Sequence, residues 1–155
     1  MQDDSHLTLI DNEIFSQILE LDDDDERNFS RGMVWEFFEQ AEKTFGEMDV
    51  ELCVLSYSFF LLFNLWHSEK KDLHKLSLLG HFLKGSSASL GLNRVQKTCE
   101  MIQHCGVKRD ELLESDLSEE VALEVMGNLL KKLRSQYGVA RKWLLDYFKS
   151  NAVGN

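Results

Sequence analysis

Apolar residues recur at intervals of three and four along most of the chain, which is typical of α-helices with one buried face. A first short helix would have an apolar face made of Ile10, Ile14, Ile18 and Leu21. Thr8 and Asp11 stand at the start of that helix as a possible capping box, in which side chains satisfy the first helical amides. The acidic run at residues 22–25 interrupts the pattern and predicts a solvated connection.

Further helices are predicted from the same spacing over residues 29–48, 71–90, 93–106 and 118–148. Gly91 and Gly106 are expected to end the third and fourth helices, because glycine readily adopts the left-handed conformation found at helix ends. Residues 108–117 are expected to form a charged loop. No segment shows a useful length of β-type alternation. The predicted fold is therefore all-α: an antiparallel four-helix bundle with a short additional N-terminal helix, forming a single domain over residues 1–155.

The segment 53–68 is unusual because it is apolar all round and rich in aromatic residues. One interpretation is a buried extension of the second or third helix, and this one is favoured. The other is an exposed apolar insertion that seeks a partner or a membrane surface. The longest apolar run, residues 52–66, has 15 residues and includes polar ones, whereas a bilayer needs about 20. No membrane span is predicted.

Composition narrows the choice of partners and compartment. The chain has 155 residues with 27 acidic and 17 basic side chains, so its net charge of -10 argues against nucleic acid as a partner. It contains no proline, which suits long uninterrupted helices. Three cysteines without a C-x-x-C pair favour reduced thiols in the cytosol or nucleus. The N-terminal residues lack the pattern of a signal peptide.

Several kinds of chemistry have no counterpart in the sequence. The glycine-rich loops that bind nucleotides are absent, and so are the Glu-x-x-His pairs of di-iron bundles. His67, His74 and His81 are spaced by seven residues, roughly 10.5 Å along a helix, so they cannot share one metal ion. No metal site is predicted.

His81 is the candidate reactive residue. At 100° per residue, it lies roughly 160° from the apolar stripe of the third predicted helix, and should therefore be exposed. Its face would carry His74, Ser77, Lys84, Gly85 and Ala88, with Leu78 at one edge. An exposed imidazole can act as a nucleophile, and Lys84 one turn on could hold a negative group attached to the ring. Gly85 removes side-chain bulk where another protein would approach.

Residues 81–92, HFLKGSSASLGL, resemble the active-site helix of the histidine-containing phosphotransfer (HPt) family. The segment 99–103, CEMIQ, resembles the following helix of the fungal members, the phosphorelay intermediates of the yeast osmosensing type. Residues 21–25, 29–32 and 38–45 are similar to the same proteins. Segment 53–68 has no counterpart known in the family, which joins the second and third helices by a short connection.

The resemblance implies a role for each matching residue. His81 corresponds to the phospho-accepting histidine, and Lys84 to the lysine that neutralises the phosphoryl oxygens. Gly85 corresponds to the glycine that permits close docking, Ser86 to a small residue beside the site, and Gln103 to a glutamine that hydrogen-bonds near the imidazole. The resemblance also implies a docking patch for receiver domains, made of Ile14, Ile18, Leu21, Phe29 and Met33, with Leu78 at its edge. Ordinary core packing is the alternative role of these apolar residues.

The function implied is that of a phosphorelay intermediate in the cytoplasm and nucleus. His81 would accept a phosphoryl group from the receiver domain of a hybrid sensor histidine kinase and pass it to the receiver domain of a response regulator. The chain would act as a monomer without a cofactor of its own, with Mg²⁺ bound by the partner receiver only. The alternative is a helical interaction module that docks receiver domains without carrying phosphate, and a metal- or cofactor-binding bundle is disfavoured.

Overall fold

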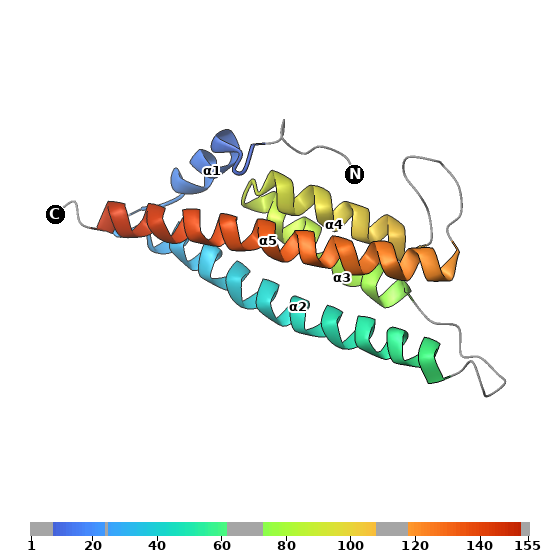
Figure 1. Ribbon diagram of the computed structural model, residues 1–155. Coiled ribbons are helices and arrows are strands. Elements are labelled where there is room, and N and C mark those ends of the chain that lie inside the picture. The colour runs from blue at the N-terminus through green and yellow to red at the C-terminus, as the bar shows by residue number, and fades with distance from the viewer. Residues whose placement is uncertain (1–7, 24, 62–72, 108–117, 153–155) are drawn as a thin grey trace.

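The structure is a computed structural model that describes residues 8–23, 25–61, 73–107 and 118–152. Within these ranges the chain forms helices and no strand: α1 (Asn12–Leu19), α2 (Asn28–Leu61), α3 (His74–Ser89), α4 (Asn93–Gly106) and α5 (Glu119–Ala152). Helices α2 and α5 are the long ones, and the shorter α3 and α4 pack beside them (Figure 1). Contacts run from α2 to α3, α4, α5 and back to α2, so the four helices close into a bundle. The predicted bundle with an additional N-terminal helix is confirmed.

Helix α1 is held against the turn between α3 and α4. Asp11 caps the helix, since its Oδ1 accepts hydrogen bonds from the backbone N–H groups of Glu13 and Ile14. The Asp11 N–H also donates to the carbonyl of Gly91, with 2.7 Å between nitrogen and oxygen. Gly91 has a φ of +69°, and a Cβ on it would lie 2.9 Å from the Asp11 carbonyl oxygen. Glycine is therefore required here both by the backbone conformation and by the close approach of α1.

Two sequence-based assignments at the N-terminal end need correction. Thr8 does not cap α1, because its hydroxyl accepts a hydrogen bond from the side chain of Asn93 at 3.0 Å. Asp22 is not merely solvated, because its carboxylate accepts hydrogen bonds from the N–H and the hydroxyl of Ser30, at 2.8 and 2.6 Å. Asp22 thereby satisfies polar groups in the first turn of α2.

Helix α2 continues well beyond the predicted end at Met48. Residues 53–61 belong to it, which confirms that this part of segment 53–68 extends a helix. Cys53 is exposed, and the expected burial of the residues after it stays a prediction. Residues 62–68 lie outside the described ranges, as do 71–72 and the expected loop at 108–117. Glu51 of α2 pairs with Lys75 in the first turn of α3. This ion pair places the start of α3 beside the part of α2 around residue 51.

The long helices α2 and α5 are joined mainly by aromatic side chains. The ring of Tyr137 on α5 contacts Phe37, Phe38 and Phe45 on α2, with centroids 5.0–6.3 Å apart. Arg134 and Arg141 of α5 place their guanidinium groups over the rings of Phe45 and Phe38. Phe15 of α1 extends this region through edge contacts with Trp143, Tyr147 and Phe148 near the end of α5.

Cys53, Cys99 and Cys105 all lie in the described ranges, and none of them forms a disulfide there. Cys53 is exposed, whereas Cys99 and Cys105 are buried. Burial raises the pKa of the Cys99 thiol to about 12, because a thiolate would lose its hydration in the core. The Cys105 thiol donates to the backbone carbonyl of Ala122 at 3.3 Å, which links α4 to the start of α5.

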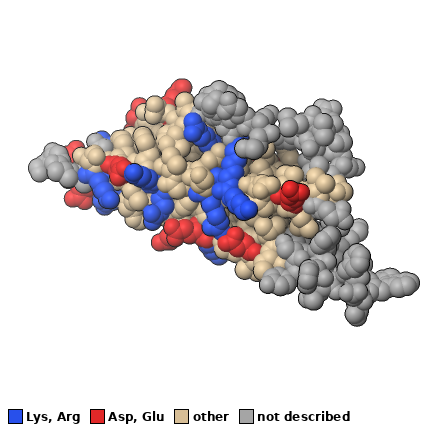
Figure 2. Space-filling view, in the orientation of Figure 1, with Lys and Arg blue, Asp and Glu red and all other residues tan. Residues whose placement is uncertain are grey.

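The surface carries charge of both signs. Figure 2 shows Lys and Arg side chains gathered next to Asp and Glu side chains on the face where α5 lies in front. This face is therefore not uniformly acidic, although the chain as a whole has a net charge of -10. Across the described ranges, no helix has both the length and the apolar character needed to cross a bilayer.

Candidate functional site

The candidate site lies on α3 where this helix packs against α4. Two glycines bring the helices together. A Cβ on Gly80 would lie 2.9 Å from the Ile102 side chain and 3.1 Å from the Cys99 carbonyl oxygen. A Cβ on Gly106 would lie 2.6 Å from that of Ser77, and closer than 3 Å to the backbone of α3. A Cβ at position 106 would therefore require the backbone of α3 to shift, and a Cβ at position 80 would be tight against α4, so the two backbones are in direct contact.

Gln103 of α4 lies opposite the residue that precedes His81. The Gln103 backbone nitrogen is 3.2 Å from the position a Cβ would take on Gly80, and the Gln103 carbonyl accepts a hydrogen bond from Ser77 at 2.8 Å. Its side-chain Oε1 is buried and has no hydrogen-bond partner among the described residues. A buried acceptor without a partner is costly, so a hydrogen bond to this oxygen would be favourable.

His81 is exposed, as its place on the helical wheel predicts. Gly85, one turn further on, is exposed too, and no described side chain lies within 4 Å of the position of its missing Cβ. The predicted face is wrong in one respect: Ser77 is 5% exposed, because it lies under α4 rather than beside His81. The surface around His81 is thus open toward Gly85 and closed toward Ser77.

Ser86 and Ser87, which follow Gly85, form hydrogen bonds within their own helix. Ser86 is half-buried and its hydroxyl donates to the carbonyl of Phe82 at 3.1 Å. Ser87 is fully buried and donates to the carbonyls of Leu83 and Lys84, at 2.7 and 3.0 Å. Both are small side chains whose polar groups are satisfied within α3, so they keep bulk away from the site without presenting a competing donor.

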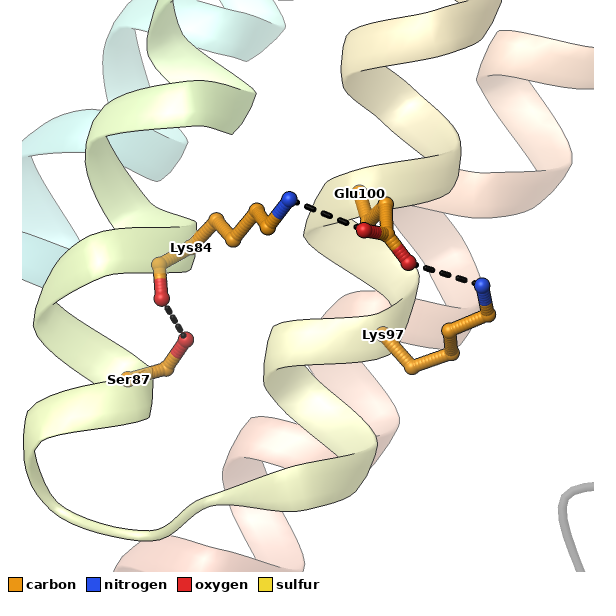
Figure 3. A network of polar contacts seen from close by, with 4 residues as sticks. All are labelled: Lys84, Ser87, Lys97 and Glu100. Carbon is orange, nitrogen blue, oxygen red and sulfur yellow. Dashed lines mark hydrogen bonds and ion pairs between the residues drawn. The ribbon is translucent and has the colours of Figure 1, made fainter.

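Lys84 reaches across from α3 to α4 (Figure 3). Its Nζ lies 2.9 Å from Oε1 of Glu100, while Oε2 of the same carboxylate lies 2.7 Å from Nζ of Lys97. The hydrogen bond from Lys84, followed by that from Lys97, lowers the pKa of Glu100 to about 2. The three side chains are each about 30% exposed, so this network lies at the edge of the α3–α4 contact and remains open to solvent.

Glu100 and Lys97 are the site residues that sequence reasoning missed. Glu100 was part of a matching segment, but nothing in the spacing of α3 indicates a carboxylate near Lys84. The available signal was the spacing of Lys97 and Glu100, since residues three apart on a helix are neighbours. That spacing predicts their ion pair but not the second lysine from another helix.

The residues of the expected docking patch differ in exposure. Leu21, Phe29 and Leu78 are at least half exposed, at 59%, 50% and 55%, and can offer apolar surface to a partner. Ile14 and Met33 are partly buried. Ile18 is 6% exposed and belongs to the core, because it lies on the face of α1 that packs inward with Phe15.

Phe82 adds an apolar side chain that the sequence analysis did not assign to a partner surface. It is 52% exposed and follows Leu78 by one helical turn, directly after His81. Phe82 and Leu78 together expose apolar area next to His81. In the described ranges, no group of three or more His, Cys, Asp or Glu residues is arranged to hold a metal ion.

Comparison with known proteins places this geometry in a family. The Hpt domain profile matches residues 32–136, which is more than half of the chain and includes His81, Lys84, Gly85 and Gln103. The chain belongs to the Hpt domain family. Multistep phosphorelay regulator 1 of Schizosaccharomyces pombe is 44% identical over 146 residues, covering 93% of this chain and 44% of that protein. The phosphorelay intermediate protein YPD1 of Saccharomyces cerevisiae is 40% identical over 97 residues, 63% of this chain and 48% of that protein.

Solved structures agree with the sequence relatives. A crystal structure of yeast YPD1 superposes with a TM-score of 0.70 at 27% identity, covering 92% of this chain and 95% of that one. YPD1 crystallised with the receiver domain of its downstream response regulator Ssk1 gives the same TM-score at 31% identity, covering 93% and 97%. The match therefore includes nearly all of the solved YPD1 chains, but less than half the length of the curated relatives.

Proposed function

We propose that this Hpt domain is a phosphorelay intermediate that carries a phosphoryl group on His81. The donor is the phospho-aspartate in the receiver domain of a hybrid sensor histidine kinase, and the acceptor is the receiver aspartate of a response regulator. The observation that carries the proposal is an exposed histidine in the matched domain with a lysine one turn away, a bare glycine beside it and exposed apolar side chains flanking it.

The chemistry requires only one nucleophile from this chain. The lone pair on the unprotonated imidazole nitrogen of His81 attacks the phosphorus atom of the aspartyl phosphate. A nitrogen–phosphorus bond forms, and the phosphorus–oxygen bond to the aspartate breaks with its electron pair leaving on the carboxylate. The other ring nitrogen keeps its hydrogen during this step. The reverse reaction with a second receiver delivers the phosphoryl group to the next aspartate.

Neighbouring residues support this transfer in different ways. Lys84 supplies positive charge to the phosphoryl oxygens, and Gln103 offers its unpaired buried oxygen to a donor near the imidazole. Gly85 leaves room for the receiver backbone to approach, while Ser86 stays hydrogen-bonded to its own helix. Leu78 and the apolar residues Leu21 and Phe29 provide surface for a transient interface.

The remaining components are assigned to the partner. The receiver supplies the Mg²⁺ that phosphoryl transfer uses, and this chain acts as a monomer without ATP or a cofactor of its own. The relay operates in the cytoplasm and the nucleus, so a fluorescent fusion should be seen in both compartments. Confinement to one compartment would contradict this part of the proposal.

The decisive test is transfer from a labelled receiver. The receiver domain of yeast Ssk1, phosphorylated with radioactive phosphoramidate, is mixed with this chain, and label on this chain is tested for acid lability. Transfer to the wild type and complete loss in His81→Gln, with unchanged helicity by circular dichroism, is the expected result. His74→Gln is the matched control and should transfer normally, since His74 is the other histidine of α3 and is exposed as well.

Two outcomes would contradict the proposal. Label that persists in His81→Gln would mean that another histidine is the acceptor. A wild-type chain that binds the receiver in sedimentation experiments but takes no label, from the receiver or directly from phosphoramidate, would instead support an interaction module that docks receivers without carrying phosphate.

A further inference from the structure

The carboxylate of Glu100 is paired with two lysines, although one lysine would balance its charge. Each of its two oxygens accepts from a different lysine, Lys84 of α3 at 2.9 Å and Lys97 of α4 at 2.7 Å (Figure 3). The trio therefore carries a net charge of +1. Because Lys97 is on the same helix as Glu100, three residues away, that pair persists whichever way the Lys84 side chain turns.

A phosphoryl group on His81 would compete for one of these cations. Lys84 is one turn from His81 on α3, so its ammonium group can serve either the phosphoryl oxygens or Glu100. Lys97 is on the other helix, α4, and stays beside Glu100. If Lys84 were the only partner of Glu100, its move to the phosphoryl group would leave a partly buried carboxylate without a counter-ion, which is unfavourable.

We propose that Glu100 and Lys97 form a counter-ion exchange for Lys84: Glu100 holds Lys84 while His81 is free, and Lys97 alone neutralises Glu100 when Lys84 moves to the phosphoryl group. This inference rests on the proposed function of His81. Glu100 and Lys97 act through Lys84 and are positioning residues. They set how strongly the domain retains the phosphoryl group rather than whether transfer occurs.

Substitutions of Glu100 and of Lys97 should change the stability of the phosphorylated form in opposite directions. Glu100→Gln removes the competitor, so Lys84 is free to serve the phosphoryl group and the phosphorylated form should gain about two- to fivefold in the exchange equilibrium with a receiver domain. Lys97→Gln removes the alternative partner, so Glu100 should retain Lys84 and the phosphorylated form should lose about the same factor.

The experiment measures the equilibrium distribution of label between this chain and the Ssk1 receiver domain, with each variant titrated against the same receiver. Glu124→Gln and Lys142→Gln, both exposed positions on α5, are the matched charge controls and should leave the distribution unchanged. Glu100→Asp keeps the carboxylate and should shift the distribution less than Glu100→Gln. Circular dichroism confirms that each variant is folded.

A Lys84→Ala background separates the exchange from general electrostatics. If Glu100 and Lys97 act through Lys84, their substitutions should have no effect in this background. Shifts that persist there would overturn the inference, because they would be caused by the altered field around His81 alone. Equal distributions for the wild type, Glu100→Gln and Lys97→Gln would also overturn it. Failure of the wild type itself to take label on His81 is a different result, and it would overturn the proposed function together with this inference.

Discussion

The two antiparallel helix pairs of the bundle are held together by opposite means. In the pair α3 and α4, glycines at 80 and 106 bring the two backbones into direct contact. In the pair α2 and α5, the contact is made by large rings around Tyr137 and by arginines that lie over them. A contact between backbones leaves the interface little freedom to adjust, whereas side chains can repack. The polar groups of the candidate site are on the pair that adjusts least.

The largest effect is expected where a methyl group is forced between α3 and α4. Gly106→Ala should lower the free energy of unfolding by about 3 kcal/mol, because its Cβ would lie 2.6–2.8 Å from Ser77 and the Leu73 carbonyl. Gly138→Ala in α5 is the control. Its Cβ meets no described atom within 4 Å, so better helix propensity should stabilise the chain by about 0.5–1 kcal/mol. Urea unfolding measures both, and equal effects would show that the two pairs do not differ.

Lys84→Ala tests whether the α3–α4 pair carries the chemistry. Loss of one charge-assisted contact costs about 1.5–3 kcal/mol. The transfer rate from a phospho-receiver should therefore fall roughly ten- to a hundredfold, at about 1.36 kcal/mol per factor of ten. Rapid-quench kinetics give the rate, and Lys142→Ala on α5 is the comparison. A rate equal to that of the wild type would mean that Lys84 is a surface lysine with no role in the transfer.

Acid should weaken the α3–α4 pair through Glu100. The pKa of this carboxyl is lowered to about 2 in the folded chain from an ordinary value of 4.5, so its stabilisation is present above pH 4.5 and is lost as the pH falls toward 2. Solvent screening limits the contribution to about 1 kcal/mol. Urea unfolding from pH 6 to 2 should show that Glu100→Gln is less stable than the wild type at pH 6 and that the difference shrinks below pH 4. A constant difference would contradict the lowered pKa.

The smallest effect is expected from shortening the end of α2. Because Glu51 pairs with Lys75, a short Gly/Ser linker can replace residues 54–72 without separating α2 from α3. The transfer rate should stay within about twofold of the wild type, since loop closure changes only slowly with length. The shortened chain should also be more soluble, because an apolar run is removed, and the protein left in the supernatant after centrifugation measures this. Lost transfer in a folded variant would mean that these residues help to form the docking surface.

Sequence reasoning predicted the fold well because amphipathic spacing determines which helix faces are buried. The range 93–106 for α4 was correct to the residue, and the left-handed Gly91 follows the end of α3 as expected. The end of α2 was missed because residues 53–61 are apolar on all sides, so no change of pattern marks where the helix stops. For Ile18 the sequence leaves docking and core packing both open, because a periodic stripe does not say which of its residues faces the core and which lies at the rim.

The candidate site was predictable to the extent that it lies on one helix. The exposure of His81 follows from the angular positions of residues on α3 alone. The partner of Lys84 does not, because Glu100 comes from a second helix, whose distance and rotation depend on the glycine contacts between the two. The same holds for Ser77, which the wheel placed beside His81 and which α4 covers.

The burial of two of the three thiols gives the unmodified chain a single point for chemical labelling. Maleimide reagents react with accessible thiolates, so Cys53 should be alkylated at neutral pH while Cys99 and Cys105 are protected until the bundle opens. A fluorophore attached there would sit two residues from Glu51, close to the ion pair with Lys75 that joins α2 to α3. Delayed alkylation of the other two thiols would then time the opening of α4, without any engineered cysteine.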